Sequence, residues 1–268
     1  MITVKFTGGL GNQMFQYAFG RRLSLDQKSE LFFDTSWYKK SPDRNFTIEN
    51  FQIAGKPSTK FEKIKRLFSE TIEEKTLLFD TKVLSTNDSL FLNGYWQSPK
   101  YFEDIEDILR KDFTLKKPQG EKYDEMLRKI TMGNSVSLHV RRGDYLAEKN
   151  VSVYTECSPE YYKKAIQYVK EINEDIHLFI FSDDTDWVKE NLKIDLPATY
   201  VSAEHFTDYQ ELTLMSACRH NITANSTFSW WGAWLNKNPE KIVITPGKWL
   251  VTDSNYENDL LPEEWTKL

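Results

Sequence analysis

The segment Ser135-Val-Ser-Leu-His-Val-Arg-Arg-Gly-Asp-Tyr145 passes from a strand pattern directly into charge. Every second residue of 136–140 is apolar, and Arg141 and Arg142 follow at once. In an open α/β sheet, ligands bind outside the carboxyl ends of the strands. Guanidinium is always charged and offers planar donors that match phosphate, so the pair predicts a phosphorylated ligand. The alternative is an arginine pair that is solvated or bound to a neighbouring carboxylate such as Asp144.

Length and composition place the chain among ordinary globular proteins. Its 268 residues suit one large domain or two small ones, and 40% of them are hydrophobic. The net charge is −5, so the chain as a whole does not favour nucleic acid or an anionic membrane surface as a partner. Any anion site must therefore be a local cluster.

The two cysteines, Cys157 and Cys218, form no Cys-x-x-Cys motif, which predicts buried thiols rather than zinc ligands or a disulfide framework. We find neither a signal peptide nor an apolar window of membrane-spanning length. The expected compartment is the cytoplasm.

The first 34 residues read as a β-α-β unit with a glycine-rich turn between the first strand, 2–6, and its helix. Gly9 and Gly11 match the first two positions of a dinucleotide fingerprint, and Asp34 lies where a ribose-binding acid is found. A nicotinamide site is therefore an alternative, although Met14 replaces the third glycine. Without that match, the glycine-rich turn still allows backbone N–H groups to approach an anion.

The chain after a linker at 116–120 alternates strands with helices. Strands are expected at 135–140, 177–181, 199–201, 221–224 and 241–245, and helices at 121–130, 158–172, 184–192, 208–217 and 228–235. Region 35–115 is less regular, with a helical stretch at 60–68, a strand at 90–96 and an amphipathic helix at 101–113. This pattern predicts an α/β fold with a doubly wound parallel sheet. We expect two Rossmann-like domains, 1–120 and 121–268, that face each other across a cleft.

Three predicted strands of the second domain end in segments rich in polar residues: 139–145, 181–184 and 224–231. Parallel strands bring these ends to one edge of the sheet. Ser226 and Thr227 begin a helix, where hydroxyls and free N–H groups form a seat for an anion. Each motif alone has an ordinary structural explanation, such as a helix cap. Together they predict a diphosphate site.

The tripeptide Asp184-Thr-Asp186 is similar to the Asp-x-Asp that holds a divalent metal in one class of sugar transferases. It also opens a predicted helix, where carboxylates are favoured without a metal. Because two arginines can neutralise a diphosphate, we predict neither a metal nor a cofactor. Asp183 is a candidate for hydrogen bonds to a base or ribose.

Three segments together resemble the signatures of the α-1,2-fucosyltransferase family, glycosyltransferase family 11. They are Gly-Gly-Leu-Gly-Asn-Gln-Met-Phe-Gln-Tyr-Ala at 8–18, His-Val-Arg-Arg-Gly-Asp-Tyr at 139–145 and Asn-Ser-Thr-Phe-Ser-Trp-Trp-Gly-Ala-Trp-Leu at 225–235. The resemblance implies a GT-B fold, GDP-β-L-fucose as donor, a galactose-terminated acceptor that a lipid can carry, and metal-independent inversion. Within the family, a chain without a membrane stem resembles the bacterial enzymes that build O-antigen. It is expected to be cytoplasmic, in reach of the inner membrane face.

The resemblance also implies which residues act. The catalytic candidates are Arg141, Asp144 and Asn12; the donor-binding candidates are His139, Arg141, Arg142, Asp183, Asn225, Ser226, Thr227 and Phe228; the loop that contacts diphosphate or acceptor holds Gly11, Asn12 and Gln13. Several roles stay open at this point. Arg142 either shares the diphosphate or serves the fold through Asp144, and His139 is either a nucleotide contact or a structural imidazole. Asp144 is either a general base or a turn residue, and a dissociative reaction needs little base assistance.

Two rival functions follow from the same residues. One is a transferase for a different nucleotide sugar. The other is a non-catalytic protein that binds glycans or nucleotides, suggested by the eight tryptophans and the aromatic content of 14%.

Overall fold

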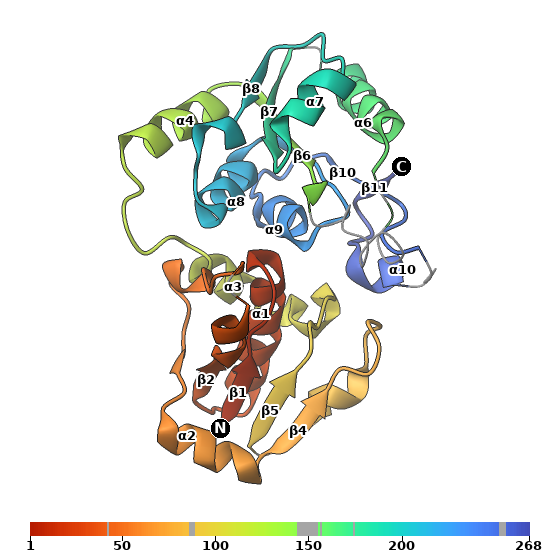
Figure 1. Ribbon diagram of the computed structural model, residues 1–268. Coiled ribbons are helices and arrows are strands. Elements are labelled where there is room, and N and C mark those ends of the chain that lie inside the picture. Colours follow the sequence, from red (N-terminus) through yellow and green to blue (C-terminus); the bar gives the residue numbers. More distant parts are fainter. Residues whose placement is uncertain (42, 86–88, 144–154, 156, 174, 252–255) are drawn as a thin grey trace. The chain divides into compact units, whose positions relative to one another are not determined.

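The computed structural model describes the chain except for residues 42, 86–88, 144–154, 156, 174 and 252–255. It divides into two compact units (Figure 1). The first unit comprises Met1–Lys117 and Asn258–Pro262, and the second comprises Pro118–Glu257 and Glu263–Leu268. The predicted boundary at residue 120 lies three residues from the observed one, and the return of Asn258–Pro262 to the first unit was not predicted.

Asp259 explains that return. Its carboxylate accepts hydrogen bonds from Lys100 Nζ at 2.6 Å and from the Phe79 backbone N–H at 2.9 Å. Its carbonyl accepts a third from the Ser98 hydroxyl at 2.7 Å. These contacts join positions about 160 to 180 residues apart in the chain, so no local pattern reveals them.

The first unit contains a five-stranded parallel sheet with the order β3-β2-β1-β5-β4. The strands are β1 (Ile2–Lys5), β2 (Leu31–Asp34), β3 (Lys56–Pro57), β4 (Glu70–Glu73) and β5 (Leu90–Asn93). Helix α1 (Leu10–Asp26) packs closely on β1, because Gly20 has no side chain to meet Val4. The edge strands β3 and β4 were not predicted, since they are short and mostly exposed.

The remaining helices of the first unit are short. They are η1 (Ser36–Lys40), η2 (Ile48–Asn50), α2 (Lys60–Lys65), η3 (Arg66–Phe68), η4 (Thr81–Ser85), η5 (Pro99–Tyr101), η6 (Glu103–Ile105) and α3 (Glu106–Asp112). The prediction of one helix at 101–113 was wrong. The rings of Tyr101 and Phe102 pack against Phe19 and Phe15 of α1, and this burial breaks the segment into two 3₁₀ turns and a short helix.

The second unit contains a six-stranded parallel sheet with the order β11-β10-β9-β6-β7-β8. The strands are β6 (Asn134–Val140), β7 (Ile176–Ser182), β8 (Ala198–Tyr200), β9 (His220–Ile222), β10 (Val243–Thr245) and β11 (Thr266–Lys267). The chain moves from β6 outward to β8 and then crosses to β9 on the other side, which confirms the doubly wound prediction. Strand β11 was not predicted.

The helices of this part of the chain are α4 (Glu121–Thr131), α6 (Pro159–Ile172), α7 (Thr185–Asn191), η8 (Ser202–Glu204), α8 (Asp208–Ala217), α9 (Thr227–Leu235) and α10 (Tyr256–Leu260). Strand β6 lies centrally, between β7 and β9, and its apolar residues are at most 1% exposed within the core of the unit. Cys157 and Cys218 are buried and form no disulfide, as predicted. The core therefore fixes the ends of β6 and β7, where the predicted site residues lie. In the part of the chain that the structure describes, no helix is both long enough and apolar enough to cross a bilayer.

Candidate functional site

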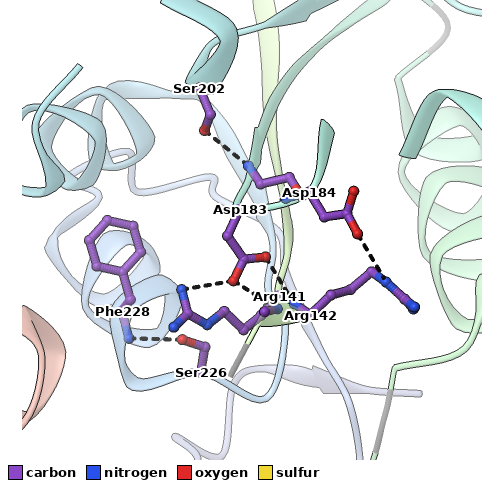
Figure 2. A network of polar contacts seen from close by, with 9 residues as sticks. Arg141, Arg142, Asp183, Asp184, Ser202, Ser226 and Phe228 are labelled. Carbon is purple, nitrogen blue, oxygen red and sulfur yellow. Dashed lines mark hydrogen bonds and ion pairs between the residues drawn. The ribbon is translucent and has the colours of Figure 1, made fainter. Parts of the chain in front are cut away.

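The ends of β6 and β7 meet through Asp183 (Figure 2). Its carboxylate pairs with the Arg141 guanidinium at 3.0 Å, Oδ2 to Nη1. The same carboxylate accepts the backbone N–H of Arg142 at 2.9 Å and that of Gly143 at 3.1 Å. Both side chains of the pair keep about a quarter of their surface exposed, 24% for Arg141 and 25% for Asp183. Asp183 was predicted to contact a base or ribose, but here it orients an arginine and the turn that follows it.

The two arginines have different surroundings. Arg142 is only 13% exposed; its guanidinium lies 3.9 Å from the ring centroid of Trp187, and its Nε is 3.7 Å from the Asp184 carboxylate. Asp144, the partner considered from the sequence, lies outside the described residues. Stacking on an indole and pairing with a carboxylate leave Arg142 as a support of this loop, whereas Arg141 is the more exposed of the two.

Asp184 also caps helix α7. Its Oδ1 accepts the backbone N–H of Trp187 at 3.0 Å, and its own N–H donates to the Ser182 hydroxyl. A helix cap and an ion pair engage this carboxylate, and the cap agrees with the helix-start interpretation of Asp184-Thr-Asp186. Among the described residues, no three His, Cys, Asp or Glu side chains gather as a metal-binding set.

Helix α9 begins at the same edge of the sheet. Ser226 is its N-cap, and the Ser226 hydroxyl accepts the Phe228 N–H at 3.3 Å. Thr227 is the first helical residue, and the first turn carries no acidic side chain. The positive end of this nine-residue helix is thus not neutralised by its own sequence, which suits an anion.

His139, near the end of β6, is 4% exposed and lies against Phe228, with 5.6 Å between ring centroids. Burial, and next the charge of Arg141, lower the pKa of His139 to about 3, so its imidazole is neutral at pH 7. Within the described part of the chain, Nδ1 has no hydrogen-bond partner. The structure thus leaves one nitrogen of the His139 ring available for a hydrogen bond.

Asn225 and Gln13, both predicted as ligand contacts, bind backbone groups in the structure. Asn225 is 2% exposed, and its amide donates to the backbone carbonyls of Thr155 and Trp249. Gln13 is fully buried; its Nε2 donates to the carbonyls of Gly8 and Asn45, and its Oε1 accepts the N–H groups of residues 47 and 48. Both amides therefore hold loops in place.

The glycine-rich turn lies in the first unit. Gly8 has a positive φ of 77°, and a side chain there would meet Asn12 Nδ2 at 2.6 Å. Asn12 Oδ1 accepts a hydrogen bond from Gln97 at 2.9 Å, and Gly11 is buried in the first turn of α1. Asp34, the acid of the nicotinamide alternative, is 3% exposed and pairs with Arg66, so it is not available to a ribose.

Glu211 was not predicted as a site residue. It lies on α8, and its carboxylate accepts a hydrogen bond from Ser202 and is close to Asp183 and Asp208. Burial, together with these two carboxylates, raises the pKa of Glu211 to about 7. Perturbed carboxyl groups of this kind concentrate at functional sites. In the sequence Glu211 is an ordinary helical glutamate, so only its surroundings distinguish it.

Two units that each contain a parallel, Rossmann-like sheet define a GT-B-like fold. Fucosyltransferase NodZ from Bradyrhizobium aligns with a TM-score of 0.56 at 14% identity, covering 86% of this chain and 91% of NodZ. A fucosyltransferase of Arabidopsis thaliana in complex with GDP aligns with a TM-score of 0.56 at 11% identity, covering 90% of this chain and 69% of that one. The predicted GT-B-like fold is confirmed.

The chain belongs to glycosyl transferase family 11, whose profile matches residues 1–268. An alpha-1,2-colitosyltransferase of Escherichia coli is 32% identical over 100% of this chain and 99% of its own length. The O-antigen biosynthesis glycosyltransferase WbnK of Escherichia coli is 30% identical over 98% of both chains. A galactoside 2-alpha-L-fucosyltransferase of Caenorhabditis elegans is 26% identical over 100% of this chain and 79% of its own. The family predicted from the three motifs is confirmed.

Proposed function

We propose that this glycosyltransferase moves L-fucose from GDP-β-L-fucose, with inversion, to the 2-hydroxyl of a galactose-type acceptor in a surface glycan or O-antigen. The names of its relatives and the three motifs support the donor and the linkage. The observation that carries the proposal is the Arg141 guanidinium, held by Asp183 and partly exposed at the carboxyl end of β6.

Arg141 can stabilise the negative charge that develops on the donor during the reaction. Cleavage of the bond between C1 and the phosphate oxygen leaves negative charge on the β-phosphate and oxocarbenium character on the sugar. A guanidinium already oriented by a carboxylate stabilises that charge without reorganisation, and removal of one such donor costs about 3–4 kcal/mol of transition-state stabilisation. The ion pair with Asp183 keeps Arg141 oriented before the donor arrives.

The start of α9 supplies the second group of donors. The N–H groups near Thr227 and the Ser226 hydroxyl, whose proton is free to donate while its oxygen caps the helix, suit the diphosphate. His139 and Phe228 support the nucleotide side, because the buried Nδ1 of His139 gains a partner when a polar ligand binds beside it. Glu211 adds a carboxylate that can accept hydrogen bonds from the base.

Base catalysis and acceptor contacts remain part of the proposal. Asp144 follows Arg141 and Arg142 closely in the chain, and we assign it to the acceptor hydroxyl as general base, although it lies outside the described residues. Asn12, which accepts a hydrogen bond from Gln97 in the first unit, is assigned a contact with the acceptor. The first unit is thereby the acceptor unit, and the second unit is the donor unit.

A second candidate is colitosyl transfer. It is favoured by the alpha-1,2-colitosyltransferase that matches the whole chain at 32% identity. Colitose is L-fucose without the 3-hydroxyl, so the two donors present the same diphosphate to Arg141. They differ by one hydrogen-bonding group on the sugar, and this difference decides between the two donors.

The proposed setting is cytoplasmic, with an acceptor that a membrane lipid carries. The reaction is proposed to need neither metal nor cofactor, because Arg141 and the α9 N-terminus offset the charge of the diphosphate.

The test is a GDP-release assay with EDTA and lactose, supplied with GDP-fucose, GDP-colitose or GDP-mannose. We expect lactose-dependent release from GDP-fucose, a product that NMR identifies as the α-1,2 linkage, and a loss of about 10²–10³-fold in kcat for Arg141→Ala. Arg219→Ala is the matched control, because Arg219 forms an ion pair of the same 3.0 Å length with Glu240 outside the site.

Each rival function has its own result in this assay. Release from GDP-colitose alone establishes the second candidate, and release from GDP-mannose alone establishes another transferase. Activity lost in EDTA and restored by Mn²⁺ contradicts the metal-free proposal. GDP binding that survives Arg141→Ala, without turnover of any donor, indicates a non-catalytic binding protein.

A further inference from the structure

The segment 60–68, which forms α2 and η3, exposes large apolar side chains to solvent. Phe61 is 61% exposed, Ile64 59%, Leu67 77% and Phe68 87%. Phe61, Ile64 and Phe68 are spaced by three and four residues, so they share one side of the continuous α2–η3 helix. Figure 1 draws α2, in orange, along the margin of the first unit.

This arrangement is the reverse of an ordinary surface helix, whose apolar side faces the core. The residue that faces the sheet is Arg66. Its guanidinium lies 3.8 Å from the ring centroid of Phe91 in β5 and pairs with the buried Asp34 of β2. The apolar side chains of the helix are therefore exposed to solvent and are not part of the core of the unit.

The charges around these side chains are basic. Residues 60–68 contain Lys60, Lys63, Lys65 and Arg66 and a single carboxylate, Glu62, a formal charge of +3 on a chain whose net charge is −5. Glu62 is directed to the helix start, where it completes the capping box with Thr59. The three lysines are exposed, and Lys65 Nζ lies 4.5 Å over the Phe61 ring.

We propose that α2–η3 docks the chain on an anionic membrane surface, with Phe61, Ile64, Leu67 and Phe68 inserted between lipids and the lysines at the phosphates. Exposed apolar side chains beside lysines are the features that hold interfacial helices on bilayers. A second copy of the chain fits less well. A symmetric interface would place this patch against itself, with its lysines facing lysines.

The proposal deepens the proposed function, because a surface-bound enzyme meets a lipid-carried acceptor directly, but its test needs no donor and no acceptor. The test is co-sedimentation of the full chain with vesicles of phosphatidylcholine alone or of phosphatidylcholine mixed with the anionic lipid phosphatidylglycerol. We expect binding to the anionic vesicles and weak binding to the neutral ones.

Three variants separate the apolar contribution to vesicle binding from the electrostatic contribution. Leu67→Ser with Phe68→Ser should weaken vesicle binding by about tenfold or more, because the bilayer no longer buries two apolar side chains. Lys63→Glu with Lys65→Glu should remove the preference for anionic vesicles, by about fivefold for each charge or more. Met132→Ser is the control, because Met132 is 86% exposed on the second unit, and it should bind as the wild type does.

Vesicle binding that both double variants retain overturns the proposal, and so does the absence of binding by the wild type. Analytical ultracentrifugation tests whether a second copy of the chain binds the exposed apolar side chains of α2–η3. A wild-type dimer that Leu67→Ser with Phe68→Ser converts to a monomer overturns the proposal in favour of self-association. Turnover of a soluble acceptor should be equal in all variants, so failure of docking and failure of the transferase proposal are distinguishable.

Discussion

The carboxylate of Asp183 lies 3.0 Å from the Arg141 guanidinium and also binds the backbone that follows Arg141. One acidic side chain at the end of β7 therefore fixes both the direction of the arginine and the turn at the end of β6. The acid that the sequence suggested as a nucleotide ligand therefore orients Arg141 in the structure.

Replacement of Asp183 should act through Arg141. In Asp183→Asn the charge that orients the guanidinium is lost, and we expect kcat to fall by about 10–100-fold, since misplacement by about 1 Å costs this much. Steady-state kinetics with GDP-fucose measures this decrease in kcat. Asp186→Asn is the control, because Asp186 is 88% exposed on the neighbouring helix. Equal activity of wild type and Asp183→Asn would show that the pair does not orient the catalytic group.

Gly143 should tolerate no side chain. A Cβ at Gly143 would lie 2.9 Å from Asp183 Oδ2, so Gly143→Ala displaces the carboxylate that holds Arg141. We expect a loss of activity similar to that of Asp183→Asn, with thermal stability changed by about 1 kcal/mol or less because Gly143 is exposed. Gly133→Ala is the control, since no atom lies within 4 Å of the added Cβ. Full activity of Gly143→Ala would contradict the prediction.

His139 should make the second unit sensitive to acid. Its pKa is lowered to about 3 in the folded chain, against about 6.5 when unfolded, so the unfolded state binds more protons between these values. The stability that depends on neutral His139 is complete above pH 6.5 and falls as the pH decreases, by about 2 kcal/mol between pH 6.5 and 5.

Urea unfolding of wild type and His139→Asn at several pH values measures this dependence. Burial also lowers the pKa of His177 and His220, and their contribution has the same sign in both proteins. The difference between wild type and His139→Asn should therefore shrink as the pH falls from 6.5 to 5. A difference that does not change with pH would show that His139 is not held neutral.

Glu211 should oppose stability while serving binding. Its pKa of about 7 lies above the ordinary 4.5, so the folded state holds the proton more tightly and stability falls as the pH rises from 4.5 through 7. Glu211→Gln removes this penalty, and the variant should gain up to about 3 kcal/mol over wild type at pH 8 relative to pH 4.5. Calorimetry should show weaker GDP binding by the more stable variant. Unchanged GDP affinity would place Glu211 outside the site.

Much of the second unit follows from local patterns. The helix predicted at 208–217 and the helices around 121–130 and 158–172 were recovered to within about a residue, because each has a cap or an amphipathic period. The structure of the first unit was predicted less well from local sequence patterns. Its edge strands β3 and β4 have two and four residues, and the segment 99–112 is divided because aromatic burial against α1 outweighs helix propensity.

The candidate site was likewise predictable from the sequence only in part. Arg141 and Ser226 were predicted from their positions after a strand and before a helix, and the structure brings their segments to one sheet edge. Asn225 and Gln13 were predicted as ligand contacts because they stand inside the motifs. In the structure their amides satisfy buried backbone groups, which cost free energy when left unpaired.

The family, the alternation of strands and helices, and the arginine pair at a strand end could all be predicted from the amino-acid sequence. These are local properties, set by side-chain type and by spacing along the chain. The three-dimensional structure was needed to show that Asp183 holds Arg141, that Arg142 stacks on Trp187, and that the pKa of Glu211 is raised to about 7. Ion pairing, stacking and desolvation depend on distances between residues far apart in the chain, and folding alone sets those distances.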